Sequence, residues 1–360
     1  MLKNLDKLID DFTAAGIPSI DICVMHHGRV VYRRMEGYSD AAKTKPINGT
    51  ERYNIYSCSK PITVTAAMQL FERGKFSLDD NIADYMPEFS DMQVSENGKI
   101  RPAKRQITIR HLLSMTAGLT YNLGSANIML GKSETDGRCP TREMMKYIAR
   151  DPLAFDPGSK YNYSLCHDVI AALVEVLSGE RFGEYVKRNI FDLLGMEDST
   201  FLPTDGEVAG LAEQYSFDNA AKVFKPIGGR NSFRFGSEYE SGGAGCVTSV
   251  NDYMKFLEGW RTGKLLKRET LDLITQNQLS GDLINDFSLR EYGYGYGLGL
   301  RCEYNGSGST DFGWGGAAGA YLACDLKHDF TVFHAQHVLG SPNQPKRNLI
   351  PGAIRKDLGE

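Results

Sequence analysis

Residues 53–61, Tyr-Asn-Ile-Tyr-Ser-Cys-Ser-Lys-Pro, lead into a run of apolar side chains at helical spacing that stops at a glycine able to cap a helix. The pattern predicts a helix from Cys58 to Arg73, with Ser57 at or just before its N-terminus. Because residues three apart share one face of a helix, we expect the amine of Lys60 to lie beside the hydroxyl of Ser57.

A serine beside a lysine can become a nucleophile. A hydroxyl alone reacts poorly, but a lysine whose pKa is lowered by burial or by another cation can accept its proton. The backbone N–H at a helix N-terminus can also stabilise the oxyanion that forms on an attacked carbonyl. The four-residue pattern by itself is weak, since a chain of this length contains it about once by chance, and a capped helix with an exposed lysine is the competing interpretation.

Outward from this helix, the pattern predicts an antiparallel sheet built from both ends of the chain. Residues 2–12 have helical spacing, and a turn then separates two strand-like segments. Residues from about 75 to 205 have mainly helical patterns, whereas strand patterns return after about residue 240. The predicted strands are Ile20–Met25, Val30–Met35, Tyr292–Arg301, Ala318–Cys324 and Phe330–Gln336.

The expected fold class is therefore α/β (α+β), an antiparallel sheet flanked by helices with an inserted, mostly helical domain. Residues 1–75 together with 206–360 are predicted to form the α/β domain, and residues 76–205 the helical domain. We expect the active site at the junction, where ligand sites are frequent.

Composition excludes several classes of protein. With 360 residues, 41% hydrophobic and 24% charged, the chain can bury a large core, which excludes disorder and a small stapled scaffold. The 45 acidic and 41 basic side chains give a net charge of −4 with no long run of either sign, so we expect no nucleic-acid partner. A small-molecule substrate is the expected partner, and the oligomeric state is left open.

The cysteines and the apolar segments indicate the cellular compartment in which we expect the protein. The seven cysteines are scattered, lack a CxxC pair and are interpreted as buried thiols, so no disulfide framework or zinc site is predicted. The start of the chain lacks the apolar run of a secretory signal. The longest apolar segment, Val169 to Leu177, contains Glu175 and is too short to span a bilayer. We therefore expect a cytoplasmic protein with no membrane partner.

The surroundings of Ser57 and Lys60 resemble the nucleophile region of the class C β-lactamase and penicillin-binding-protein-like serine hydrolases. The resemblance extends across nearly the whole chain and includes the helix and loop that lie behind the active site in that family. The stretches that carry it are residues 53–61, 69–80, 85–89, 107–119 and 158–196.

The family's second motif is a Pro-Gly pair followed by Tyr-Ser-Asn, whose tyrosine lies near the serine–lysine pair. Here residues 157–158 lead to Tyr163-Ser164-Leu165, so the resemblance implies that Tyr163 takes this place, with Tyr161 as a competitor. A tyrosine acts as a base only as a phenolate, which the ammonium of Lys60 would stabilise. Leu165 replaces the family's asparagine and cannot hydrogen-bond the amide side chain of a penicillin or cephalosporin.

The family's third motif is a strand that carries Lys-Thr-Gly, or His-x-Gly in many relatives. Trp314-Gly315-Gly316 occupies the corresponding place. A cation there attracts the carboxylate of a β-lactam, whereas tryptophan offers an apolar wall and one N–H donor. Trp-Gly-Gly is the version found in family VIII carboxylesterases, which favours an esterase over a lactamase. The two glycines would let substrate approach the strand closely.

The resemblance implies a complete site. Its members are the catalytic residues Ser57, Lys60 and Tyr163; the oxyanion-hole N–H groups of Ser57 and Ala317; and the substrate-binding residues Trp314, Gly315, Gly316, Leu165 and Tyr121. The implied activity is that of a serine hydrolase that cleaves small esters, with amides or lactams as further substrates, through an acyl-enzyme on Ser57 and with no cofactor or metal. A β-lactamase or D-amino-acid peptidase, an acyltransferase and a non-catalytic penicillin-binding-like protein are the alternatives.

Other chemistry-bearing residues form weaker patterns. His167 and Asp168 follow Ser164 and suggest a Ser–His–Asp system, but no GxSxG elbow accompanies them, so His167 is interpreted as a histidine near the site rather than in it. The glycines that alternate from 293 to 299 indicate a strand rather than a phosphate-binding loop, and no nucleotide is implied.

Overall fold

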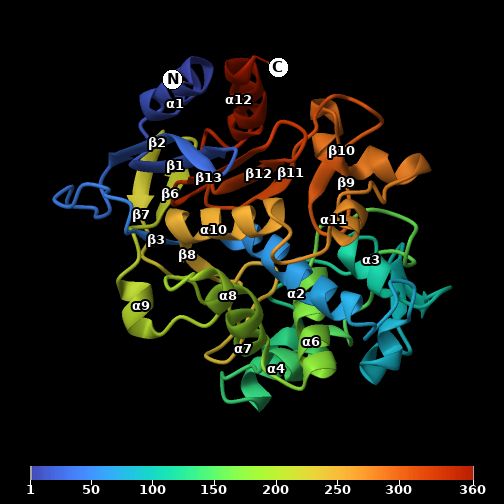
Figure 1. Cartoon of the computed structure of the whole chain (residues 1–360). Coiled ribbons are helices and arrows are strands. Elements are labelled where there is room, and N and C mark those ends of the chain that lie inside the picture. The colour runs from blue at the N-terminus through green and yellow to red at the C-terminus, as the bar shows by residue number, and fades with distance from the viewer. Residues whose placement is uncertain (1, 360) are drawn as a thin grey trace.

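The computed structural model describes residues 2–359. Its centre is a seven-stranded antiparallel sheet with the strand order β2-β1-β13-β12-β11-β10-β9 (Figure 1). The predicted fold class, an antiparallel sheet with flanking helices, is confirmed. The strands of this sheet are β1 (Ser19–His26), β2 (Arg29–Gly37), β9 (Tyr294–Tyr296), β10 (Arg301–Glu303), β11 (Phe312–Gly315), β12 (Tyr321–Asp325) and β13 (Phe330–Ala335).

The two ends of the chain meet in this sheet. Strands β1 and β2 form the predicted hairpin, and β1 also pairs with β13, which places Cys23 opposite Phe333. The carboxylate of Asp357 accepts hydrogen bonds from the backbone N–H groups of Asn4 at 2.9 Å and Leu5 at 3.0 Å. The first and last helices are thereby fastened to each other as well as to the sheet.

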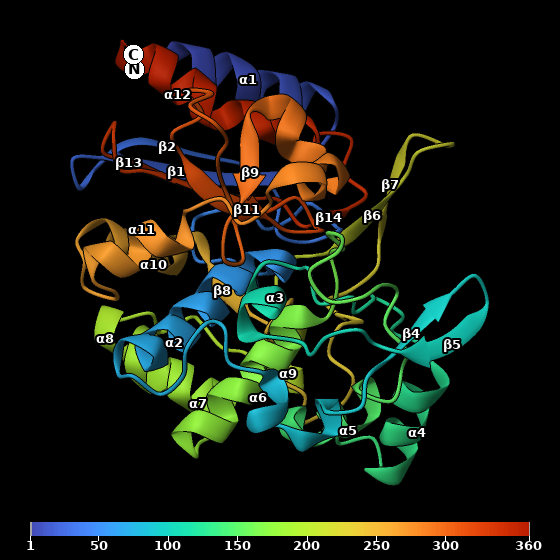
Figure 2. The ribbon, with the colours of Figure 1, turned by 90° about the vertical axis from the view of Figure 1, so that its right-hand side faces the viewer.

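Helices cover both faces of the sheet (Figure 2). Helices α1 (Lys3–Ala14) and α12 (Ile350–Leu358) lie on one face, and α10 (Val250–Arg261) and α11 (Arg268–Ile274) lie on the other. The apolar side of α1 packs into a core shared with β1 and β13, which explains the helical spacing of apolar residues at the start of the chain.

The middle of the chain is mostly helical, and α2 (Lys60–Glu72) packs against α6 (Cys166–Ser178). The remaining helices are α3 (Ile109–Leu113), α4 (Ala126–Glu134), α5 (Thr141–Ile148), α7 (Phe182–Val186), α8 (Asp192–Leu194) and α9 (Asp205–Ala209). None of the helices in residues 2–359 combines the length and the apolar character needed to cross a bilayer. The division of the chain into two domains stays a prediction.

Three small sheets complete the fold. Strand β3 (Arg52–Asn54) pairs with β8 (Val247–Ser249) and leads directly into the segment that carries Ser57. The other two small sheets are β14-β6-β7, with β6 (Tyr215–Asp218), β7 (Val223–Pro226) and β14 (Val338–Leu339), and the hairpin of β4 (Gln93–Glu96) and β5 (Lys99–Pro102).

Two predicted strands differ from the structure. The single strand predicted over Tyr292–Arg301 is wrong, because the chain forms the short strands β9 and β10 with a tight link between them. At Gly299 in this link φ is +88°, and a side chain there would overlap His167, so the alternating glycines serve a close turn rather than one extended strand. The strand predicted from Ala318 begins only at Tyr321, because residues 316–319 make a turn.

Candidate active site

Ser57 lies in a single 3-10 turn, η1 (Tyr56–Ser59), that joins β3 to α2. The residue before it, Tyr56, has φ +47°, in the left-handed region that non-glycine residues rarely adopt. The hydroxyl of Ser59 donates to the carbonyl of Tyr56 at 2.6 Å and accepts from the N–H of Cys246 at 3.0 Å. The β3–β8 pair and these hydrogen bonds hold the sharp turn that presents Ser57 at the start of the helix.

Lys60 makes three hydrogen bonds and has no acid among them. Its ammonium donates to the Ser57 hydroxyl at 3.1 Å, to the Tyr121 hydroxyl at 3.0 Å and to the carbonyl of Gly243 at 2.7 Å. The side chain is fully buried, and burial lowers the pKa of Lys60 to about 7. A substantial fraction of this lysine is therefore neutral at neutral pH and can accept the proton of the hydroxyl beside it.

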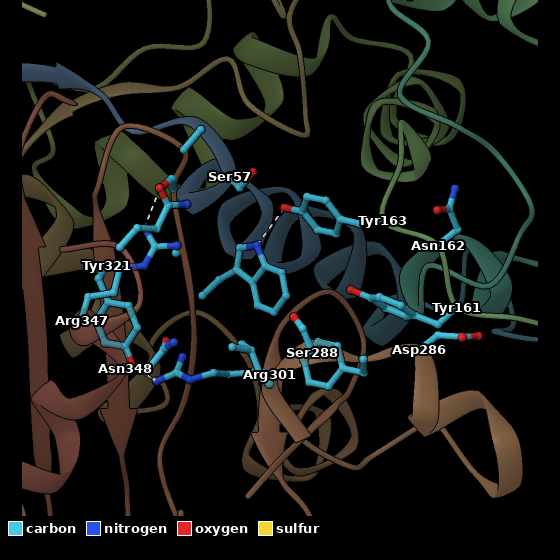
Figure 3. A pocket seen from close by; sticks show the side chains of 17 residues that line it. Ser57, Tyr161, Asn162, Tyr163, Asp286, Ser288, Arg301, Tyr321, Arg347 and Asn348 are labelled. Atoms are coloured by element: carbon cyan, nitrogen blue, oxygen red, sulfur yellow. Dashed lines mark hydrogen bonds between the residues drawn. The ribbon is translucent and has the colours of Figure 1, made fainter. Parts of the chain in front are cut away.

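Tyr163 lies beside both Ser57 and Lys60. Its hydroxyl accepts a hydrogen bond from Trp314 Nε1 at 2.8 Å (Figure 3). Its ring centroid is 4.5 Å from Lys60 Nζ. Burial raises the pKa of Tyr163, and the hydrogen bonds from Ser57 and Trp314 oppose this effect only in part. The phenol thus keeps its proton, so that of the two side chains only Lys60 is able to accept a proton from Ser57.

Ser57, Tyr163 and Trp314 line a cavity of about 510 Å³. Trp314 forms part of its wall and stacks on Phe287, with ring centroids 6.3 Å apart and planes at 14°. Tyr161 packs against Phe287 as well, so one side of the cavity is aromatic, while arginines lie on the other side (Figure 3). The cavity is lined by Ser57, Tyr161, Asn162, Tyr163, Asp286, Phe287, Ser288, Leu289, Arg301, Trp314, Gly315, Gly316, Ala317, Tyr321, Gln344, Arg347 and Asn348.

The end of β11 brings Ala317 to the cavity wall. A turn follows the strand, in which Gly316 N donates to Ala320 O at 2.8 Å. The guanidinium of Arg347 donates to the same two residues, to Gly316 O at 2.6 Å and to Ala320 O at 3.1 Å. This turn sets the direction of the Ala317 backbone. A side chain at Gly316 would overlap the carbonyl of Ile55, so glycine here allows β11 to approach the η1 turn.

The structure brings together most of the predicted site residues. Of the two candidate tyrosines, Tyr163 lies beside Lys60, whereas Tyr161 packs against Phe287 farther along the cavity. Tyr121 is bonded to the lysine and is not among the residues that line the cavity. Leu165 is buried at the start of α6, with 4% of its surface exposed, and does not line the cavity either.

His167 lies on α6 and is fully buried. Neither ring nitrogen of His167 has a hydrogen-bond partner within residues 2–359, and burial holds its pKa well below the usual range. Ser164 instead contacts Cys166 Sγ at 3.1 Å. Ser164, His167 and Asp168 therefore do not form a proton relay.

Sequence reasoning missed three residues of this site and considered Asp168 only as the acid of a Ser–His–Asp system. Gly243 and Asp168 face Lys60, while Phe287 and Arg347 line the cavity. The glycine-rich run from 241 to 245 was the signal for Gly243, because a glycine cluster marks a close approach of backbone to another group. Nothing in the local sequence of Phe287 or Arg347 indicates a place in the cavity wall.

A sequence model of the family described as Beta-lactamase matches residues 5–348. The chain belongs to the beta-lactamase family. Esterase EstB from Burkholderia gladioli is 32% identical over 267 residues, which are 69% of this chain and 67% of that protein. Acyltransferase mokF from Monascus pilosus is 28% identical over 270 residues, which are 71% of this chain and 65% of that protein. The match thus spans about two thirds of these two curated relatives.

Solved structures of the beta-lactamase fold superpose on the whole chain. The structure entitled "EstCE1, a hydrolase with promiscuous acyltransferase activity" is 27% identical, with a TM-score of 0.78 and coverage of 100% of this chain and 99% of that one. A simvastatin synthase variant from Aspergillus terreus shares the fold at 24% identity and a TM-score of 0.81, over 99% of this chain and 97% of that one. The resemblance that the three motifs indicate is confirmed.

Proposed function

We propose that the protein is a serine hydrolase that cleaves small carboxylic esters through an acyl-enzyme on Ser57. The observation that carries the proposal is the hydrogen bond between Lys60 Nζ and Ser57 Oγ, in which a buried amine with a lowered pKa lies beside a hydroxyl at the cavity wall. Esterase EstB, the relative at 32% identity, has a name that fits this reaction.

The first half of the reaction transfers the acyl group. Ser57 Oγ bonds to the ester carbonyl carbon while its proton passes to neutral Lys60, and the negative charge moves to the carbonyl oxygen. The N–H groups of Ser57 and Ala317 would bind that oxyanion. When the intermediate collapses, the bond to the alkoxy oxygen breaks, and the leaving alcohol takes a proton from Lys60 through Tyr163.

The second half releases the acid. A water molecule gives a proton to Lys60 and bonds to the acyl carbon, and collapse of this second intermediate breaks the bond to Ser57 Oγ. The serine then recovers its proton from the lysine, so that the resting site is restored. We propose that the substrate lies with its carbonyl against the turn at Ala317 and its apolar part against Trp314.

Esters suit this cavity better than β-lactams do. Trp314 stands where a lactamase carries a cation, and its only polar atom already donates to Tyr163. Leu165 supplies no amide to hold a lactam side chain. A cytoplasmic location stays a prediction of the sequence.

Acyl transfer to an alcohol is the second candidate function. It is favoured by the names of two relatives, Acyltransferase mokF and EstCE1, the latter called a hydrolase with promiscuous acyltransferase activity. The acyl-enzyme step is common to both reactions, and only the acceptor differs.

Turnover of p-nitrophenyl butyrate and nitrocefin, measured side by side for the wild type and Ser57→Ala, tests the proposal. We expect ester hydrolysis that disappears in the variant and little or no cleavage of nitrocefin. Rapid nitrocefin turnover would instead support a β-lactamase. Silence on both substrates, with no ester formed when an alcohol is added, would support a non-catalytic binding protein.

A further inference from the structure

Asp168 is a buried acid that faces the proposed base without touching it. Its side chain lies on α6, is 1% exposed and accepts a hydrogen bond from the Tyr239 hydroxyl at 3.1 Å. Because an unpaired carboxylate is costly to bury, a charge of opposite sign is expected nearby. The mechanism proposed above gives this residue no task.

Gly243 shows where the opposite charge lies. A methyl group placed on its Cα would be 2.7 Å from Asp168 Oδ2 and 3.5 Å from Lys60 Nζ, so the carboxylate and the amine border the same small volume. These two distances place the charged atoms at most about 6 Å apart. Gly243 borders both of them, and its carbonyl accepts one of the lysine's hydrogen bonds at 2.7 Å. Glycine is the residue that leaves room for this arrangement.

No other acid faces the lysine within residues 2–359. The titratable groups around Lys60 are Cys58 on η1, Tyr121 in the loop after α3, Tyr163 before α6, and Cys166, His167 and Asp168 on α6. The thiols and phenols among them are neutral near pH 7, and burial raises the pKa of Cys58, Cys166, Tyr121 and Tyr163 further. His167 is held neutral by its low pKa. Burial raises the pKa of Asp168 as well, while the hydrogen bonds from Ser241 and Tyr239 and the charge of Lys60 oppose that effect. Asp168 is therefore the one carboxyl group among the described residues that faces Lys60.

We propose that Asp168 is a positioning residue that acts through Lys60: its negative charge sets the pH above which the lysine becomes neutral and can accept the serine proton. This inference rests on the proposed function. Without the carboxylate, the ammonium loses its electrostatic partner in a buried site, so the lysine would release its proton at a lower pH.

The test is the rate at which a fluorophosphonate labels Ser57 between about pH 5 and pH 9, which needs no knowledge of the natural substrate. In this reaction Ser57 Oγ bonds to phosphorus, fluoride leaves, and the hydroxyl proton passes to Lys60. We expect the acid limb of the labelling profile to move about one to two pH units lower in Asp168→Asn, with a plateau within about threefold of the wild type.

Matched variants separate charge from packing. Asp168→Glu keeps the charge and is expected to keep the limb near the wild-type position, and Asp168→Ser is a second neutral variant if the asparagine disturbs folding. Asp252→Asn makes the same change at a buried acid on α10 that does not face Lys60, and its limb should stay in place. A wild type whose Ser57 resists labelling would overturn the proposed function itself. Labelling with an unmoved limb in folded Asp168→Asn or Asp168→Ser would overturn the role of Asp168 alone.

Discussion

Lys60 and Arg301 are both fully buried cations, but the fold surrounds them differently. Arg301 is bonded to the carboxylate of Asp311 at 2.5 Å and to the hydroxyl of Tyr321 at 2.6 Å. Burial lowers its pKa, but Tyr321 and Asp311 outweigh that effect, so the pKa of Arg301 is raised. Lys60 has only uncharged oxygens within hydrogen-bond distance, and its pKa falls to about 7.

This difference indicates which of the two equally buried cations can exchange a proton. An ion pair at contact distance fixes the charge and makes the arginine part of the scaffold, with Arg355 bridging Asp311 and Asp325 beside it. An acid that lies near the lysine without bonding to it, as Asp168 does, leaves the lysine near the balance point between its two protonation states. Burial is the same for the two cations, so the distance from the acid, together with the guanidinium's inability to lose its proton, separates the scaffold cation from the reactive one.

The largest effect on activity is expected when Lys60 is replaced by arginine, the residue type of the scaffold cation Arg301. Lys60→Arg keeps a positive charge but cannot act as a base, since guanidinium does not lose its proton in proteins. We expect kcat/KM for p-nitrophenyl butyrate to fall by about 10³-fold or more. In Lys60→Met, kcat/KM should fall as far. Circular dichroism checks that both variants are folded. Substantial activity in Lys60→Arg would contradict the assignment of Lys60 as the base.

The same chemical change at the two acids should lower the stability of the protein by different amounts. Asp311→Asn leaves Arg301 buried without its counter-charge, and we expect the free energy of unfolding to drop by about 3 to 5 kcal/mol. Asp168→Asn breaks no contact ion pair and should cost less than about 2 kcal/mol. Urea unfolding of the two variants measures this contrast, and equal losses would show that distance from the cation is not what distinguishes the two sites.

The pH profile of the wild type sharpens the comparison further. Lys60 is active only when neutral, and its pKa is about 7, so kcat/KM should decline below pH 7 by about tenfold per pH unit. The phenol of Tyr163 keeps its proton because its pKa is raised, so the profile should show a plateau on the alkaline side of this limb. Hydrolysis of p-nitrophenyl butyrate over a range of buffers would show an acid limb near pH 4 if a carboxylate, rather than the lysine, were the base.

Most of the sheet and the grouping of the residues of the candidate site could be predicted from the sequence, whereas the charges around Lys60 could not. Ser57 and Lys60 are three residues apart, so helical spacing alone places them together, and motif order supplies Tyr163. Gly243 lies 183 residues from Lys60, and only the folded chain shows that its carbonyl holds the amine. The strand predicted over Tyr292–Arg301 failed for a related reason, because the chain turns at Gly299, where φ is +88° and Val64 and His167 leave no room for a side chain, although the local pattern is extended.

The smallest effect is expected when Tyr163 loses the hydrogen bond that it accepts from Trp314. Trp314→Phe removes the N–H that donates to Tyr163 at 2.8 Å but retains an aromatic ring against Phe287. Loss of one hydrogen bond to a group that relays a proton should lower kcat by about 3- to 10-fold with little change in KM. Steady-state kinetics with p-nitrophenyl butyrate measures both constants. A rise in KM with an unchanged kcat would show instead that Trp314 acts only as a wall for substrate, and that the phenol needs no donor to hold its orientation beside Lys60.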